Sequence, residues 1–262
     1  MRPINSFATT RADLERLFRI KYGDLENYGW GPRTRKRLRY FSPDDHYEAL
    51  LLRLVSEGCT WLDVGCGRAL FPSNPPLARL LANRVAVLVG VDPDPTLDEN
   101  PFVHERVLNA MEAFHGEQRF DLVTMRMVAE HVTEPEDVVA SVARALKPGG
   151  LAVVYTVNRF SPVPLITGVV PFALHHPAKW FLWGAERKDT FPTAFRMNTR
   201  TRLRRLFESQ GLGEVYFAYL DDCRTFGRFR LGLWLELVVW RCLRAIGLRY
   251  PETCLLGVYC KK

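Results

Sequence analysis

Two acidic residues and a pair of glycines have the types and the spacing that bind a nucleotide-like ligand. The run Trp61-Leu62-Asp63-Val64-Gly65-Cys66-Gly67 is apolar and ends in an acid and two glycines, as is typical of a buried strand that turns sharply towards such a ligand. A second acid, Asp92, ends the next apolar run, where a carboxylate can accept both hydroxyls of a ribose. Because Gly-x-Gly pairs also occur in ordinary turns, the interpretation depends on the rest of the chain.

The chain after the glycines disfavours a pyrophosphate. A phosphate site needs a glycine run that leads directly into a helix N-terminus. Here the loop Arg68-Ala69-Leu70-Phe71-Pro72-Ser73-Asn74 intervenes. We therefore expect a nucleoside-like ligand rather than a dinucleotide at this turn.

Composition indicates a globular protein with a full core. The chain has 262 residues, of which 47% are hydrophobic, and a formal net charge of +7. The six cysteines contain no Cys-x-x-Cys pair, and the N-terminus lacks the apolar core of a signal peptide. These features predict a reduced, cytoplasmic protein with no metal site. A basic run, Arg33 to Arg39, fits nucleic acid, anionic lipid or an acidic substrate, but a solvated positive face is the favoured interpretation.

The elements that would position the two acids alternate between strands and helices from residue 60 onward. Apolar periodicity predicts strands at residues 60–64, 85–91, 102–107, 120–125, 151–157, 215–220 and 254–260. Helices are predicted at residues 75–83, 199–210 and 228–245. A further helix is predicted to start at a capping box, Thr133–Glu136, and to end at Pro148-Gly149-Gly150. This order predicts an α/β protein with a Rossmann-like, doubly wound, seven-stranded sheet.

Four segments are predicted around this sheet. Residues 1–41 form an N-terminal helical arm, and residues 42–158 form the ligand-binding core, which opens with a helix capped by Ser42 and ended by Gly58. Residues 159–198 are rich in Pro, Phe, Trp and His without a clear period, which favours a substrate-binding lid inserted after strand five. Residues 199–262 complete the sheet.

Four motifs in register resemble the class I S-adenosylmethionine-dependent methyltransferases. Leu62-Asp63-Val64-Gly65-Cys66-Gly67 is similar to the first motif of this family, and Gly90-Val91-Asp92 to the second. Phe120-Asp121-Leu122-Val123 with Glu130-His131-Val132 resembles the fourth strand and its loop, and Leu146-Lys147-Pro148-Gly149-Gly150 the turn before the fifth strand. The resemblance covers about residues 43–158. It also implies that the last strand is antiparallel.

The resemblance implies a cofactor, S-adenosylmethionine, with S-adenosylhomocysteine as the product. Asp63, Gly65, Cys66 and Gly67 would shape the methionine side of the pocket, and Asp92 would hold the ribose. Pro93 would lie near the adenine, and Asn109, with Ala110 and Met111 beside it, takes the place of a frequent acid that faces the adenine amine. Arg126 and Met127, at the tip of strand four, would line the cofactor.

Catalysis would need little from the protein beyond positioning, because the sulfonium is already activated. A base is required if the acceptor is a hydroxyl that must lose a proton. His131 is the first candidate because it follows strand four, and the alternative is that it orients the loop. His175 and His176 in the insertion are further candidates, with a structural role as the alternative.

The predicted function is methyl transfer to a small-molecule or lipid-like acceptor, at oxygen. A cofactor-binding protein without catalysis and an RNA methyltransferase that uses the Arg33–Arg39 run remain alternatives, although nucleic acid is disfavoured because no RNA-binding domain is recognised. The 228–245 helix is apolar over more surface than a sheet-covering helix requires. Core packing, a homodimer interface and peripheral membrane contact are its candidate uses.

Overall fold

The sheet has seven strands in the order β3-β2-β1-β4-β5-β7-β6. This computed structural model describes residues 7–161 and 192–262. The strands are β1 (Thr60–Val64), β2 (Val87–Asp92), β3 (Glu105–Leu108), β4 (Phe120–Arg126), β5 (Leu146–Val157), β6 (Leu212–Asp221) and β7 (Glu252–Lys261). The strands β1 to β5 are parallel, and β7 lies between β5 and β6 and is antiparallel to both. The predicted fold class is confirmed.

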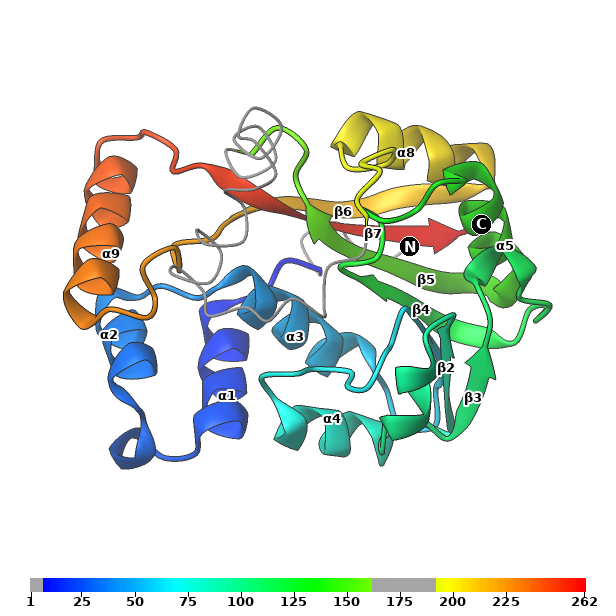
Figure 1. The fold of residues 1–262 in the computed structure, drawn as a ribbon, viewed down its shortest axis with the longest axis horizontal. Coiled ribbons are helices and arrows are strands. Elements are labelled where there is room, and N and C mark those ends of the chain that lie inside the picture. Colours follow the sequence, from blue (N-terminus) through cyan, green and yellow to red (C-terminus); the bar gives the residue numbers. More distant parts are fainter. Residues whose placement is uncertain (1–6, 162–191) are drawn as a thin grey trace.

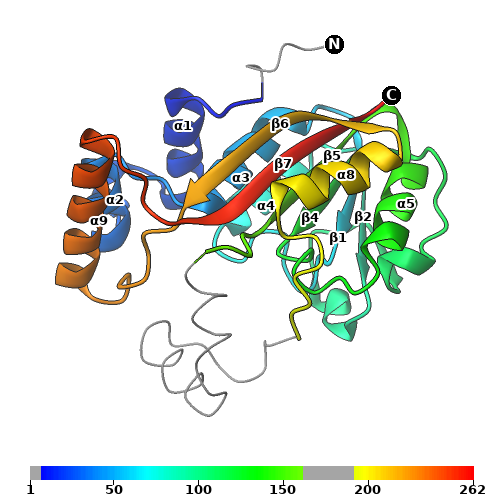
Figure 2. The same ribbon diagram turned by 90° about the horizontal axis from the view of Figure 1, so that it is seen from above.

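Helices cover both faces of the sheet, as Figures 1 and 2 show. On one face lie α1 (Arg11–Tyr22), α3 (Pro43–Leu54) and α4 (Pro75–Ala82), and on the other α5 (Pro135–Ala145) and α8 (Arg200–Ser209). A pair of helices, α2 (Trp30–Leu38) and α9 (Arg230–Ala245), packs together at one end of the molecule. Each face of the sheet therefore has its own hydrophobic core under these helices, and successive strand residues point alternately into one core and the other.

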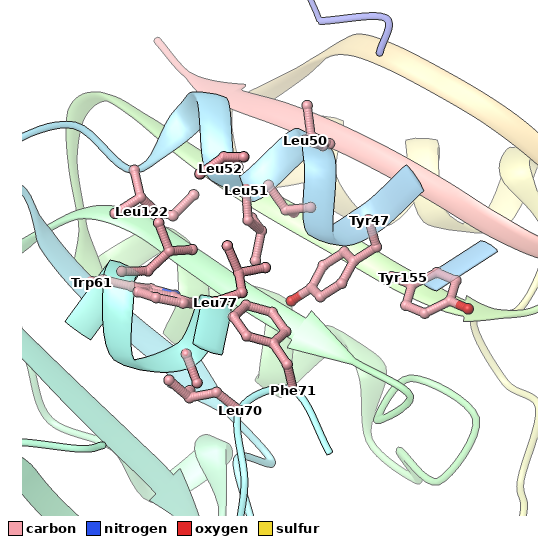
Figure 3. Packing of buried hydrophobic residues seen from close by; sticks show 14 of the residues in the cluster. Tyr47, Leu50, Leu51, Leu52, Trp61, Leu70, Phe71, Leu77, Leu122 and Tyr155 are labelled. Atoms are coloured by element: carbon pink, nitrogen blue, oxygen red, sulfur yellow. The ribbon is translucent and has the colours of Figure 1, made fainter. Parts of the chain in front are cut away.

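The core between the sheet and helices α3 and α4 supports the turn after β1 (Figure 3). Trp61 is fully buried and lies beside Phe71, while its indole nitrogen donates to Thr124 Oγ1 at 2.7 Å. Tyr47 of α3 stacks on Tyr155 of β5 with ring centroids 5.1 Å apart. The loop 68–74 thus contributes apolar anchors to this core, which holds the turn and α4 against the sheet.

Helix α3 starts as the sequence predicts. The Ser42 hydroxyl accepts from the Asp45 N–H, and the Asp45 carboxylate accepts from the Ser42 N–H, a reciprocal cap. The helix ends at Leu54, however, and Gly58 lies in the following turn. The prediction that Gly58 ends the helix was therefore wrong by one turn.

Three other local predictions differ from the structure. Glu134 precedes α5 without a side-chain cap, so the predicted capping box does not form. Helix α5 ends at Ala145, and Pro148-Gly149-Gly150 lies inside β5, where a bulge opposite Phe120–Leu122 accommodates the extra residues. The third strand begins at Glu105 rather than at residue 102, since Phe102 and Val103 pack into the core beside it.

The basic run lies in α2, and one of its arginines is internal. Arg35 is buried and donates to Asp45 Oδ2 at 2.8 Å and to the Tyr22 hydroxyl at 2.7 Å. Burial opposes ionisation of Asp45, but Arg35 and Lys21 outweigh it and lower the pKa of that carboxyl. The interpretation as a solvated face was thus wrong for Arg35, which joins the N-terminal arm to α3.

Candidate functional site

The two glycines after β1 adopt conformations that other residues avoid. Gly65 has φ +67° and Gly67 has φ +42°. The Gly65 N–H donates to Val91 O at 2.7 Å, which ties the turn to the end of β2. A Cβ at Gly65 would overlap the Val128 side chain. The turn is therefore closely packed against the loop after β4 as well as conformationally strained for any side chain.

Asp92 ends β2 directly beside this turn. Its Oδ2 accepts from the Gly67 N–H at 2.9 Å, and its Oδ1 accepts from the Asp94 N–H at 2.8 Å. A carboxylate offers about four acceptor positions, so each oxygen keeps room for one further donor. A ribose supplies two neighbouring hydroxyl donors. The two acceptor oxygens of Asp92 therefore fit the ribose of a nucleoside cofactor.

Asn100 also stabilises the turn after β1, although no sequence motif marks this residue. Its side-chain amide donates to Gly67 O at 3.0 Å, and its own Oδ1 accepts from the Phe102 N–H. Cys66 packs its sulfur against Gly90, where a Cβ would collide with it, and is buried. Only the backbone of Cys66 can therefore face a ligand.

Asp63 is buried near the end of β1, and the pKa of its carboxyl is raised. Burial raises its pKa to about 7, although the Thr124 hydrogen bond at 2.5 Å and the Arg126 guanidinium act in the opposite direction. Thr124 comes from β4 at the register position opposite Asp63. A cation brought next to Asp63 would favour its ionised form.

The tip of β4 carries a charged cluster that reaches elements far apart in sequence. Arg126 donates to Asp44 Oδ1 at 3.1 Å, and Arg224, after β6, donates to Asp44 Oδ2 at 2.8 Å. Burial opposes ionisation of Asp44, but the two guanidinium groups outweigh it and lower its pKa to about 2. The Arg126 guanidinium thus faces the start of α3.

Met127 follows with a strained backbone. Its φ is +53°, and its N–H donates to Tyr155 O at 2.7 Å. Non-glycine residues in this region concentrate at functional sites, where the surrounding structure holds them. The strain at Met127 therefore marks the loop after β4 as part of the site.

Glu130 and His131 lie on that loop beside the segment that precedes α8. Burial raises the pKa of Glu130, whose Oε2 accepts from the Thr156 hydroxyl at 2.7 Å. Asn198 donates to Thr156 Oγ1 at 2.7 Å. His131 is half-buried, and its Nδ1 donates to Pro192 O at 2.8 Å. The loop after β4 is thereby joined to β5 and to the segment 192–198.

The residues after β2 and β3 form the far side of this edge. Pro93 is exposed, and Asn109 turns its side-chain oxygen back onto the Ala110 N–H at 2.9 Å. The Asn109 N–H donates to Asp92 O, which ties the end of β3 to the end of β2. Met111 is buried in the core.

The parallel strands bring most of the predicted site residues to one edge of the sheet. Asp92 and Arg126 each end a parallel strand, Asp63 is the last residue but one of β1, and Asn109 directly follows β3. His175 and His176 lie outside the described residues, as does most of the predicted lid. In residues 7–161 and 192–262, no three His, Cys, Asp or Glu side chains are grouped so that they could hold a metal ion. Nor does any helix in these two ranges have the length and apolarity to cross a membrane.

Comparison with known proteins identifies the family. A methyltransferase domain profile matches residues 33–215. The chain belongs to the class I S-adenosylmethionine-dependent methyltransferases. Its cofactor is S-adenosylmethionine, as the motif resemblance implies, and the acceptor oxygens of Asp92 fit its ribose.

Curated relatives of this methyltransferase are matched over part of their length. A ubiquinone biosynthesis O-methyltransferase of Coxiella burnetii is 28% identical over 148 residues, which is 53% of this chain and 61% of the relative. One of Xanthomonas axonopodis is 34% identical over 160 residues, 57% of this chain and 64% of the relative. The match therefore spans less than two thirds of these relatives.

A solved structure shares the fold. The S-adenosylmethionine-dependent methyltransferase of Mesorhizobium loti superposes with a TM-score of 0.53 at 17% identity, covering 84% of this chain and 98% of that one. The agreement concerns the arrangement of the sheet and its helices.

Proposed function

We propose that this methyltransferase transfers a methyl group from S-adenosylmethionine to a small-molecule or lipid-like acceptor, at oxygen. The observation that carries the proposal is the cradle of Asp92 and the Gly65–Gly67 turn, placed at the same sheet edge as His131. The curated relatives, named ubiquinone biosynthesis O-methyltransferases, favour an oxygen atom on a small molecule as the acceptor.

In this proposal each strand end has a part in holding the cofactor. Asp92 accepts the ribose hydroxyls, while Asp63, the two glycines and the backbone of Cys66 surround the methionine portion. Pro93, Asn109 and Ala110 line the adenine side, and Arg126 and Met127 close the pocket from β4. The bound cofactor supplies an electrophilic methyl group on a sulfonium. The protein holds the acceptor in line with that methyl and excludes water.

His131 is proposed as the general base. Its Nδ1 donates to the carbonyl of Pro192, so the neutral ring keeps its lone pair on Nε2. An Nε2 lone pair can take the proton of an acceptor hydroxyl as the oxygen attacks the methyl group. His175 and His176 lie outside the described residues and have no part in this proposal.

Two alternatives lead to different measurements. A protein that only binds the cofactor would bind it without turnover of any acceptor. An RNA methyltransferase would use the basic run, but Arg35 of that run is engaged with Asp45 inside the protein. The proposed small-molecule function therefore ranks above both.

Cofactor titration tests the binding site. We expect the parent to bind S-adenosylmethionine, and Asp92→Ala to bind it at least about 100-fold more weakly, because two hydrogen bonds to a charged group are lost. Asp98→Ala is the matched control, since Asp98 is an exposed acid in the same segment. No binding by the parent would refute the proposal, and unchanged binding by Asp92→Ala would refute the ribose assignment.

Turnover with labelled methyl donor tests the acceptor and the base. A panel of phenols, catechols and hydroxylated isoprenoid quinones is compared with RNA, and label in a hydroxylated small molecule is expected. His131→Ala should lower kcat about 10²- to 10⁴-fold without changing cofactor affinity. His131→Gln, which keeps a donor for Pro192 O but has no base, should be equally slow. Recovery of turnover in His131→Gln would instead mean that His131 orients the loop.

A further inference from the structure

Helix α9 turns an apolar face away from the protein. Its inward residues Leu233, Leu237 and Trp240 pack with Tyr40 in a small separate core. Its outward residues are also apolar: Leu231 is 69% exposed, Trp234 46% and Leu235 49%. With 3.6 residues per turn, Val238, Val239, Cys242 and Ala245 share this outward face. A helix that only covers a core has a polar outer face, so α9 is apolar where such a helix would meet water.

The apolar surface continues beyond both ends of the helix. Phe226 and Phe229 precede α9 and are exposed, and Ile246 and Leu248 follow it and are exposed. A groove of about 450 Å³ runs between Phe226, Tyr250 and the Leu235–Val239 side of α9. Contiguous exposed apolar surface of this kind marks an interaction site.

Positive charge borders this surface. Between residues 223 and 251 the acid is Glu236 alone, and its carboxylate is buried and accepts from the N–H groups of Thr225 and Phe226. Arg230 and Arg241 lie along one edge of the apolar face, and both are exposed. Helix α2, which packs beside α9 at the same end of the molecule (Figure 1), carries the exposed Arg33 and Arg37.

We propose that α9 and its flanking phenylalanines dock this protein on the surface of an anionic lipid bilayer. The apolar face would enter the boundary between head groups and acyl chains, where Trp is favoured, and the arginines would meet lipid phosphates. A second copy fits less well, because a two-fold interface on this face would set arginines opposite arginines, and residues 223–251 offer no exposed acid to pair them. The inference does not depend on the proposed acceptor, since it concerns binding to lipid alone.

Vesicle co-sedimentation of the full chain tests this inference. The protein is expected to sediment with vesicles of phosphatidylcholine mixed with phosphatidylglycerol, weakly with phosphatidylcholine alone, and less at high salt. Leu231→Glu should abolish sedimentation, whereas Leu80→Glu should not, because Leu80 is a 39% exposed leucine on the distant helix α4. Arg241→Gln should weaken binding about fivefold, and Arg205→Gln, at an exposed arginine on α8, should leave it unchanged.

Cofactor affinity and unfolding temperature of each variant establish that it is folded. Absence of parent sedimentation with the anionic vesicles would overturn the inference, as would equal loss in Leu231→Glu and Leu80→Glu. A dimer in sedimentation equilibrium that Leu231→Glu converts to a monomer, without vesicle binding by the parent, would instead assign this face to a second copy. Because the readout is lipid binding, a failed methylation assay leaves the result intact.

Discussion

Replacing Gly65 with alanine separates two reasons for a glycine at the cofactor turn. The first is the positive φ, which costs an alanine about 1–2 kcal/mol. The second is the overlap of a new Cβ with the Val128 side chain, and overpacking of this kind costs typically about 1–3 kcal/mol. Gly58 supplies the matched control, because its φ is +69° but a Cβ there would meet nothing within 4 Å.

We therefore expect Gly65→Ala to lower the free energy of unfolding by about 2–5 kcal/mol, the sum of both costs. Gly58→Ala should lose only the first part, about 1–2 kcal/mol. At about 2–4 °C per kcal/mol for a protein of this size, thermal unfolding resolves the difference. Affinity for S-adenosylmethionine should fall in Gly65→Ala alone, because the displaced turn carries the Gly67 N–H away from Asp92.

The double variant Gly65→Ala/Val128→Ala tests the steric part directly. Removing the Val128 methyl groups leaves room for the new Cβ, so the double variant should be more stable than the sum of the two single changes predicts. Urea unfolding of the parent, both single variants and the double variant gives this coupling. Equal destabilisation by Gly65→Ala and Gly58→Ala, together with additive behaviour in the double variant, would refute the reasoning.

Three further predictions follow from the buried polar groups. Asp63 has a folded pKa of about 7 against an ordinary value of 3.8, so between these pH values the folded state keeps a proton that the unfolded chain releases. The free energy of unfolding should therefore fall by up to about 4 kcal/mol as pH rises from 4 to 7. Urea unfolding of the parent and of Asp63→Asn across this range should show the slope in the parent alone. Asp44→Asn, which removes the carboxylate that both Arg126 and Arg224 contact, should cost about 3–5 kcal/mol at pH 7, and less as pH falls from 4 towards 2, because protonation of Asp44 weakens the parent there. A constant loss across that range would contradict the assignment. Asn100→Ala, which frees Gly67 O, should weaken cofactor binding about tenfold in calorimetry, and unchanged affinity would mean that the turn holds itself.

The succession of strands and helices along the chain could be predicted from the sequence, because each element carries its own local pattern. The apolar runs ending at Val64 and Asp92 are buried strands that end where predicted, and Ser42 caps α3 as predicted, while the structure adds the bond from Asp45 back to Ser42. Parallel strands bring their carboxyl ends to one edge, so the placement of Asp63 and Asp92 at that edge follows from this order alone. The ends of helices were predicted less reliably. Residues 148–150 were expected to end a helix but lie inside β5, because a bulge accommodates them.

Contacts between distant segments were decided by the tertiary structure. Asp44 meets Arg224 across 180 positions, and no local pattern marks such a pair. Asn100 has an ordinary loop sequence around it, yet its amide donates to Gly67 O in the turn after β1. Arg35 belongs to a run that local charge patterning assigns to solvent, but the tertiary structure buries it and brings it to Asp45 of α3. The sequence by itself thus determined which residues gather at the carboxyl edge of the parallel strands, through local periodicity and chain order, whereas burial and partners depended on which helices pack together.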